Sequence, residues 1–293
     1  MTAHNPRARA AAEFAADRIA LTGLALLALL LAAALLAPWI SPQNPYDLAR
    51  LDLLDSRLPP GARSAAGAIH WLGTDDQGRD MLSAILYGLR TSVAVGLTST
   101  VLGLAIGVSL GLAAAWLGGW TDALLMRLAD LQLSFPSILI ALVLLAVLGQ
   151  GLDKIIIALV AVQWAYYART ARAAALVERR KEYVDAAIAL ALSNARIIFR
   201  HLLPNCLPPL LVLATVQVAA AITLEATLSF LGLGLPITQP SLGLLISNGF
   251  NYLLSGHYWI SVFPGIALVL AVVSINLLAD RLRDVLDPHE RQR

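Results

Sequence analysis

A series of long apolar segments most constrains what this chain can fold into. A bilayer core about 30 Å thick requires roughly 20 apolar residues from each spanning helix. Six segments approach or exceed that length, at 19–40, 92–115, 131–148, 155–167 (extending to 176), 207–235 and 259–279. Within lipid, helices satisfy every backbone donor and acceptor internally. The sequence therefore predicts an all-α membrane protein with six transmembrane helices.

The composition agrees with lipid as the main solvent and excludes several function classes. Only 14% of the residues are charged, against about a quarter in soluble domains, and mean hydropathy is +0.73. A net charge of +2 gives no bulk electrostatic support to nucleic-acid binding. Cys206 is the single cysteine, and the five histidines lie far apart without ligand spacing. We expect no metal, no cofactor and no nucleic-acid partner.

The first apolar segment also resembles a signal peptide, because Arg7, Arg9 and Arg18 precede it. Its apolar run is longer than the usual hydrophobic region of about 7–15 residues. An uncleaved first helix is therefore favoured, with cleavage as the alternative.

Basic residues predict the orientation, because they concentrate on the cytoplasmic side of membrane proteins. With six spans, fifteen Lys and Arg residues fall on the side of both termini and six on the other side. We therefore expect five parts: a cytoplasmic N-terminal segment (1–18), a first transmembrane helix (19–40), an external loop (41–89), a transmembrane core (90–280) and a cytoplasmic tail (281–293).

The external loop begins with turn-forming residues and then reads "WLGTDDQGRDMLSAILYGLRTS" at 71–92. This stretch predicts a turn followed by an amphipathic helix, with Asp80, Ser83 and Tyr87 on its wet side. The alternative is a surface loop that only connects two spans.

Three features predict how the spans pack and bend. Gly103, Gly107 and Gly111 recur every four residues, which places three bare backbones on one stripe and lets another helix approach closely. Proline removes a backbone hydrogen bond, so kinks are expected at "SFPS" (134–137) and at Pro264.

One long stretch, "EYVDAAIALALSNARIIFRHLLPN" at 182–205, mixes charges with apolar residues at helical spacing. Its apolar residues Tyr183, Ala186, Ala187 and Leu190 follow the i, i+3, i+4, i+7 pattern of one helix face. A second helical stretch is expected at 195–203, where Arg196 and Arg200 lie one turn apart, and "LPN" is expected to break it. Such a segment is either a membrane-surface element or a docking surface.

The same stretch resembles the EAA loop of the membrane subunits of bacterial ATP-binding-cassette importers. Five others resemble the second permease of the dipeptide/oligopeptide/nickel/glutathione group: "WLGTDDQGRD" (71–80), "RTSVAVG" (90–96), "FPSILIALVLLAVLG" (135–149), "EATLSFLGLG" (225–234) and "LRDVLDP" (282–288). The resemblance implies the type I importer permease fold in a bacterial inner membrane. It also implies a second homologous permease, two cytoplasmic ATP-binding subunits and an external solute-binding protein as partners.

By this resemblance the loop 178–205 docks on an ATPase subunit. The residues matched to that role are Glu182, Tyr183, Asp185, Ala186, Ala187, Ala191 and Arg196. Small residues allow close approach and a few charges fix register. The alternative for Glu182 and Asp185 is that they only stabilise the N-terminus of their own helix. The chain departs from the group at Ala191, where glycine is usual at the turn, and at Gln77.

The chain contains no GxxxxGK[ST] loop, so the expected role is a permease without ATPase activity, driven by ATP in a partner. The expected cargo is a peptide, with a nickel chelate or glutathione as the alternative. An intramembrane protease would require a nucleophile and base within the bilayer, and an ion-coupled carrier would require several ionisable groups there. Only Glu225 lies clearly in a span. It either lines the pathway or makes a structural hydrogen bond between helices.

Overall fold

The computed structural model describes residues 17–47, 51–65 and 67–286, and these are predominantly helical. Residues 1–16 of the predicted N-terminal segment and the end of the C-terminal tail lie outside the described residues. The main helices are α2 (Arg18–Ile40), α3 (Met81–Leu117), α4 (Gly119–Leu133), α5 (Ser137–Leu148), α6 (Leu152–Glu178), α7 (Glu182–Ala189), α8 (Asn194–Arg196), α9 (Leu203–Phe230), α10 (Leu242–Phe250) and α11 (Trp259–Leu286). The short strands β1 (Ala62–Arg63) and β2 (Ile69–His70) pair antiparallel, and Leu53–Asp55 and Leu253–Ser255 form 3-10 turns.

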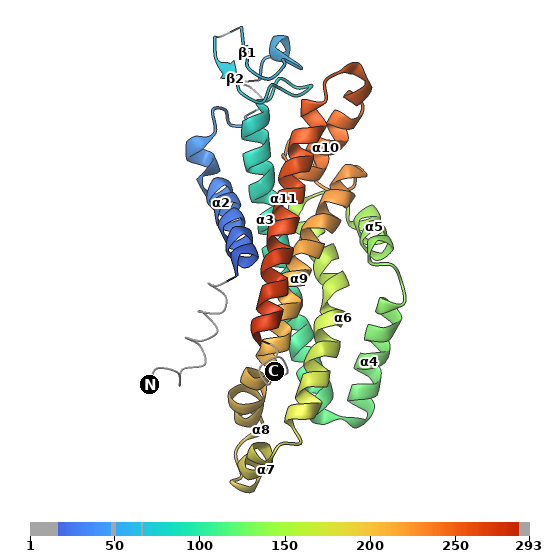
Figure 1. Cartoon of the computed structure of the whole chain (residues 1–293). Coiled ribbons are helices and arrows are strands. Elements are labelled where there is room, and N and C mark those ends of the chain that lie inside the picture. The colour runs from blue at the N-terminus through green and yellow to red at the C-terminus, as the bar shows by residue number, and fades with distance from the viewer. Residues whose placement is uncertain (1–16, 48–50, 66, 287–293) are drawn as a thin grey trace, which may run out of the picture.

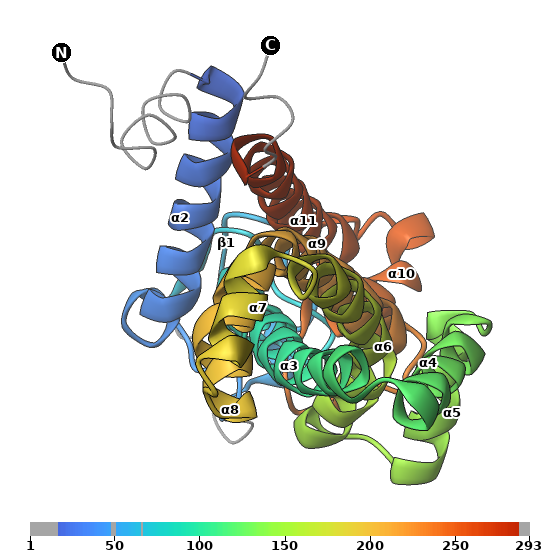
Figure 2. The same cartoon turned by 90° about the horizontal axis from the view of Figure 1, so that it is seen from below.

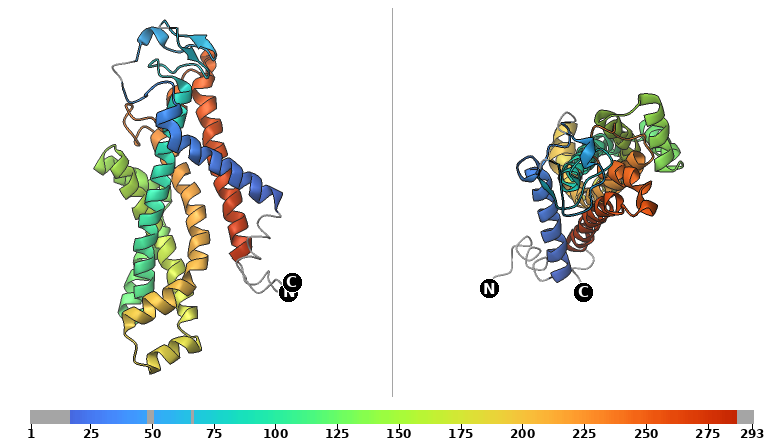
Figure 3. Two further views of the ribbon diagram at one scale, coloured as in Figure 1. Left: turned by 90° about the vertical axis from the view of Figure 1, so that its left-hand side faces the viewer. Right: turned by 90° about the horizontal axis from the view of Figure 1, so that it is seen from above.

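The long helices α3, α6, α9 and α11 run beside one another and form the body of the bundle (Figure 1). The strands lie at one end of this bundle, and α7 and α8 lie at the other (Figure 1). Seen from below, α7 and α8 cross the end of the bundle (Figure 2). Helix α2 lies obliquely against α11 at the side of the bundle (Figure 3). The loops 41–80 and 178–205 are therefore at opposite ends, as the predicted topology requires.

Within the described residues, four helices are long and apolar enough to cross a membrane: Arg18–Ile40, Met81–Leu117, Asn194–Phe230 and Trp259–Asp284. The pair α4 and α5 makes a fifth candidate, bent by 91° at its break. The expected span at 131–148 is not one continuous helix, because the chain breaks at residues 134–136, where proline lacks a donor. The kink predicted at "SFPS" is thus confirmed, and the count of six spans stays a prediction.

The start of the fifth predicted span also differs from the expectation. The helix does not break at "LPN" but runs on from Asn194 to Phe230, with a π-helical turn at Ile197–Leu202. The ring of Pro204 would clash with the carbonyl of residue 200 in a regular helix. The wider π turn ends at Leu203, whose N–H bonds to the carbonyl of Ile198, and so relieves this conflict without a break. Pro264 likewise lies inside α11, which continues through it.

The glycine stripe of α3 packs against α6, as the spacing predicted. A Cβ at Gly103 would lie 3.2 Å from the Cβ of Gln163. A Cβ at Gly107 would collide with the carbonyl oxygen of Trp164 and with Tyr167. The two backbones therefore approach more closely than any larger residue permits.

The predicted wet face of the helix that follows the first loop is wrong. Asp80, Ser83 and Tyr87 are buried, because the loop 41–80 folds over the start of α3. The Asp80 carboxylate caps α3, accepting from the backbone N–H of Ser83 at 2.8 Å. It also lies 3.0 Å from Nδ1 of His70 on β2. The polar side chains serve the helix start instead of facing water.

The loop 41–80 is joined to the chain near α10 and α11 by buried polar contacts. Arg79 and Asp75 are both fully buried and pair at 2.6 Å, and Nη1 of Arg79 donates to the carbonyl of Ile237 at 3.1 Å. Trp259 Nε1 donates to the carbonyl of Thr74 at 3.0 Å. Early and late parts of the sequence thus close this end of the bundle together.

Candidate functional site

Helix α7 presents one exposed stripe at the end of the bundle. Glu182, Asp185, Ala186 and Ala189 follow the i, i+3, i+4, i+7 pattern, and all four are exposed. The acids Glu182 and Asp185 lie in the first turn, where the positive end of the helix dipole stabilises them. The stripe offers two carboxylates and two small side chains, a surface that another protein can approach closely.

The opposite face of α7 packs on the chain itself, and it is not the face that the apolar pattern predicted. Val184 is fully buried and Ala187 is 4% exposed, and both contact Ile197. The apolar pattern placed Ala186 and Leu190 on one face with Ala187, but both are exposed, Leu190 by 74%. Ala187 therefore packs between the exposed stripe and the rest of the chain, and almost none of its surface is accessible. Arg196 lies on α8 and is exposed.

The turn after α7 is left-handed although it lacks the usual glycine. Ala191 has a φ of 54°. Its N–H bonds to the carbonyl of Ile188 at 2.9 Å, and the N–H of Leu192 bonds to the carbonyl of Ala187 at 3.2 Å. These two bonds form a Schellman motif, and Leu192 packs on the cluster around Val184, as this motif usually requires. The motif outweighs the strain of a Cβ in the left-handed region.

A chain of hydrogen bonds, here called the α7 strap, ties this helix to both neighbouring helices. The Tyr183 hydroxyl donates to Oε2 of Glu178, at the end of α6, at 2.8 Å. It accepts from Nδ2 of Asn205, at the start of α9, at 3.2 Å. Burial, and then the hydrogen bond to the Glu178 carboxylate, raises the pKa of Tyr183 to about 12. The hydroxyl therefore remains a donor throughout the physiological pH range.

A second tie joins the same region to α3. Arg179 donates through Nη1 to the carbonyls of Ala115 at 2.7 Å and Trp116 at 3.0 Å, in the last turn of α3. Its guanidinium also lies over the Trp116 ring, 5.1 Å from the ring centroid. The α7 region is thus held by α3, α6 and α9, so that a displacement of α7 acts on all three.

Glu225 is fully buried within α9 and bonded to serines. It accepts from the hydroxyl of Ser92 on α3 and from that of Ser229 one turn later, both at 2.8 Å. Of the two alternatives for this residue, the structure favours a hydrogen bond between helices. Glu225 is not among the residues that line the cavity between α5, α6, α9 and α11.

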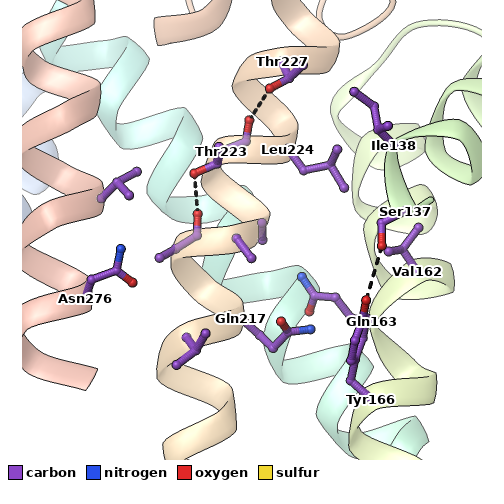
Figure 4. A pocket seen from close by; sticks show the side chains of 15 residues that line it. Ser137, Ile138, Val162, Gln163, Tyr166, Gln217, Thr223, Leu224, Thr227 and Asn276 are labelled. Atoms are coloured by element: carbon purple, nitrogen blue, oxygen red, sulfur yellow. Dashed lines mark hydrogen bonds between the residues drawn. The ribbon is translucent and has the colours of Figure 1, made fainter. Parts of the chain in front are cut away.

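A cavity of about 500 Å³ lies between α5, α6, α9 and α11 (Figure 4). Its wall is mainly apolar, with neutral polar groups spaced along it. The polar residues are Ser137, Gln163, Tyr166, Gln217, Thr223, Thr227 and Asn276. Figure 4 shows the amides of Gln163 and Gln217 pointing into the gap between α6 and α9. A cavity of this size can hold a small molecule with the volume of a few amino-acid residues.

Sequence reasoning missed this cavity. The signal was present, because Gln163, Gln217 and Asn276 are side-chain amides inside apolar segments, where an unpaired polar group is costly. Periodicity alone does not say which of them share one cavity.

Comparisons with known proteins decide the family. Residues 103–292 match the model of the binding-protein-dependent transport system inner membrane component. The chain belongs to this permease family. Residues 5–60 also match the N-terminal transmembrane domain of oligopeptide transport permease C.

Permeases of this family similar to the chain cover nearly all of it. A putative peptide transport system permease protein of Brucella suis is 45% identical over 91% of this chain and 86% of its own length. The di/tripeptide transport system permease protein DppC of Pseudomonas aeruginosa is 39% identical over 94% and 90%. The probable D,D-dipeptide transport system permease protein DdpC of Escherichia coli is 38% identical over 92% and 87%.

A solved structure shows the fold. An inward-facing structure of the MetNI methionine ABC transporter matches with a TM-score of 0.58 at 20% identity, over 71% of this chain and 98% of that chain. The expected type I ABC importer permease fold is therefore confirmed. As an ABC importer permease, the chain is a multi-pass inner-membrane protein that works with ATPase and substrate-binding partners.

Proposed function

We propose that this permease forms half of the pathway through which an ATP-driven importer takes up di- or oligopeptides. A second, homologous permease supplies the other half. The observation that carries the proposal is the cavity between α5, α6, α9 and α11, whose neutral polar lining suits a small polar cargo. The peptide cargo is supported by the names of the similar permeases, which are those of peptide, di/tripeptide and D,D-dipeptide transport systems.

In this proposal two cytoplasmic ATPase subunits drive the exchange between inward- and outward-open states, one of them through α7 of this chain. The exposed stripe of Glu182, Asp185, Ala186 and Ala189 is the contact. Both termini and the α7 end then face the cytoplasm, and the loop 41–80 faces the solute-binding protein. The permease itself does not hydrolyse ATP, in line with the absence of a phosphate loop from its sequence.

The direct test is reconstitution of the permease with its second permease, ATPases and solute-binding protein in liposomes. Uptake of a labelled dipeptide should require the binding protein outside the vesicle and ATP at the α7 end. Uptake without ATP, or none of any dipeptide by a complex that hydrolyses ATP, would contradict the proposal. The purified permease alone should show no ATP hydrolysis.

The docking contact can be tested by placing a bulky side chain on the exposed stripe of α7. Ala186→Trp would hold an ATPase subunit away from the stripe and forfeit the packing of the interface. We expect this variant to lose co-purification of the ATPase subunits. Glu182→Lys should weaken assembly more gently, because a charge at the rim of an interface mainly alters association rate and salt dependence.

The matched control is Ala195→Trp, which adds the same bulk to an exposed alanine on α8, off the stripe. It should leave assembly intact. If α7 lies on the membrane surface instead, a tryptophan at position 186 anchors it better in the interface, and assembly survives. That outcome would remove α7 from the docking contact.

A further inference from the structure

The cavity is lined by side-chain amides whose hydrogen-bonding capacity the protein itself leaves partly unused. Gln217 on α9 is only 9% exposed, and its amide has no hydrogen-bond partner among the described residues. The neighbouring amides on the wall are Gln163 on α6 and Asn276 on α11. Gln163 accepts from the Thr100 hydroxyl at 3.5 Å through Oε1, and its Nε2 has no partner in the described part of the chain. Neither amide is among the enclosed, unpaired polar atoms of the described residues, so both reach the cavity space, where a ligand or water can complete their hydrogen bonds.

The wall is also free of strong charge. None of its lining residues is an aspartate, glutamate, lysine, arginine or histidine. The remaining hydroxyls are partly occupied: Thr223 donates to the carbonyl of Ala219, and Thr227 donates to that of Thr223. The unsatisfied capacity of the wall is therefore concentrated in side-chain amides.

A side-chain amide carries both donors and an acceptor, the same set that a peptide group presents. The two can pair with one another in complementary fashion, whatever side chains the peptide bears. A carboxylate or guanidinium on the wall would instead attract peptides of one charge and repel the other.

We propose that Gln217, with Gln163 opposite it and Asn276 elsewhere on the same lining, is a cargo subsite that binds the uncharged peptide group and does not discriminate between cargo charges. This inference rests on the proposed function, since it assigns a subsite on the same pathway. It adds a named residue and the cargo chemistry that the residue recognises.

The test compares three labelled dipeptides in the reconstituted complex: Ala-Ala, Lys-Ala and Glu-Ala. Gln217→Leu keeps a similar volume and removes the amide. It should slow uptake of all three by the same factor, about 5-fold, the value of one hydrogen bond. Gln217→Glu keeps the shape and adds a charge, and it should raise the ratio of Lys-Ala to Glu-Ala uptake by about 10-fold.

The matched control is Gln150, an exposed glutamine outside the cavity that donates to the carbonyl of Gly232. Gln150→Leu and Gln150→Glu should leave the ratios among the three dipeptides as in wild type. This control separates contact with cargo from a general effect of charge on the complex.

Three results would overturn the inference while leaving the proposed function standing. They are uptake by Gln217→Leu equal to wild type, a loss confined to one of the charged dipeptides, or an unchanged uptake ratio in Gln217→Glu. In the last case Gln217 acts on the fold and does not touch cargo. If the wild-type complex imports none of the three dipeptides, the proposed function fails, and the subsite assignment fails with it.

Discussion

Removal of the Tyr183 hydroxyl should loosen α7 without changing the stripe that α7 exposes. In Tyr183→Phe a single oxygen is lost, and with it the bonds to Glu178 at 2.8 Å and from Asn205 at 3.2 Å. A hydrogen bond to a charged acceptor contributes about 1.5–3 kcal/mol. Tyr183 is only half-buried, and Glu178 keeps its bond from Lys181 at 2.6 Å, so the lower end applies.

A loss of about 1.4 kcal/mol corresponds to a tenfold change in an equilibrium constant. The population in which α7 is detached from α6 and α9 should therefore rise about tenfold. Hydrogen exchange measures this directly, because the amides of α7 exchange through that detached state. We expect their exchange to accelerate about tenfold in Tyr183→Phe, while exchange in α3 and α6 stays as in wild type.

The functional consequence is weaker coupling. The Ala186 stripe is intact, so the ATPase subunits should still co-purify with Tyr183→Phe and hydrolyse ATP. Peptide uptake per ATP hydrolysed in liposomes should fall, because a loosely held α7 transmits less of the ATPase movement to the membrane helices. Tyr46→Phe serves as the control, since Tyr46 belongs to the loop 41–80, which lies at the opposite end of the bundle from α7.

Two outcomes would refute this reasoning. Exchange in α7 at the wild-type rate would show that the strap does not hold the helix. Loss of the ATPase subunits from Tyr183→Phe would show that the hydroxyl belongs to the docking contact and not to the strap.

Two further predictions concern stability. Gly107→Ala places a Cβ against the Trp164 carbonyl and should destabilise the permease by about 1–3 kcal/mol, measured by thermal unfolding in detergent. The control is Gly265→Ala on α11, where a Cβ meets open space and should cost no stability. Equal melting temperatures of the two variants would show that α3 and α6 do not require the close approach. Ala191→Gly relieves a left-handed alanine and should slow hydrogen exchange in the turn after α7 by a factor corresponding to about 0.5–1 kcal/mol. Faster exchange would mean that the flexibility of glycine outweighs the strain.

The sequence was sufficient where a short periodic pattern had one structural solution. The spacing of Gly103, Gly107 and Gly111 defines a stripe whatever helix it meets, and α6 proved to be that helix. Pro136 fixed the place of the break between α4 and α5, because its missing donor is a local property. The angle of 91° depends on packing among distant helices and was not predictable.

Elsewhere the local pattern admitted several solutions. The sequence around α7 places alanine and larger apolar residues on more than one face, and the contact with Ile197 selects Val184 and Ala187 over Leu190. Asp80 and Ser83 were predicted to face solvent because the loop that covers them could not be placed from sequence. The amide of Gln217 faces a cavity that exists only once four helices have assembled.

The hydrogen bonds between the loop 41–80 and later parts of the chain, at Ile237 and Trp259, have a consequence for biosynthesis. Thr74 and Trp259 lie 185 residues apart, and Arg79 and Ile237 lie 158 apart. A ribosome makes the first partner of each bond long before the second. Until then Arg79 and Asp75 remain hydrated, since burial of this pair depends on the cover that arrives later. This end of the protein is therefore completed last, after the insertion of α11, and a chain that stops before Trp259 lacks the cover of this charged loop.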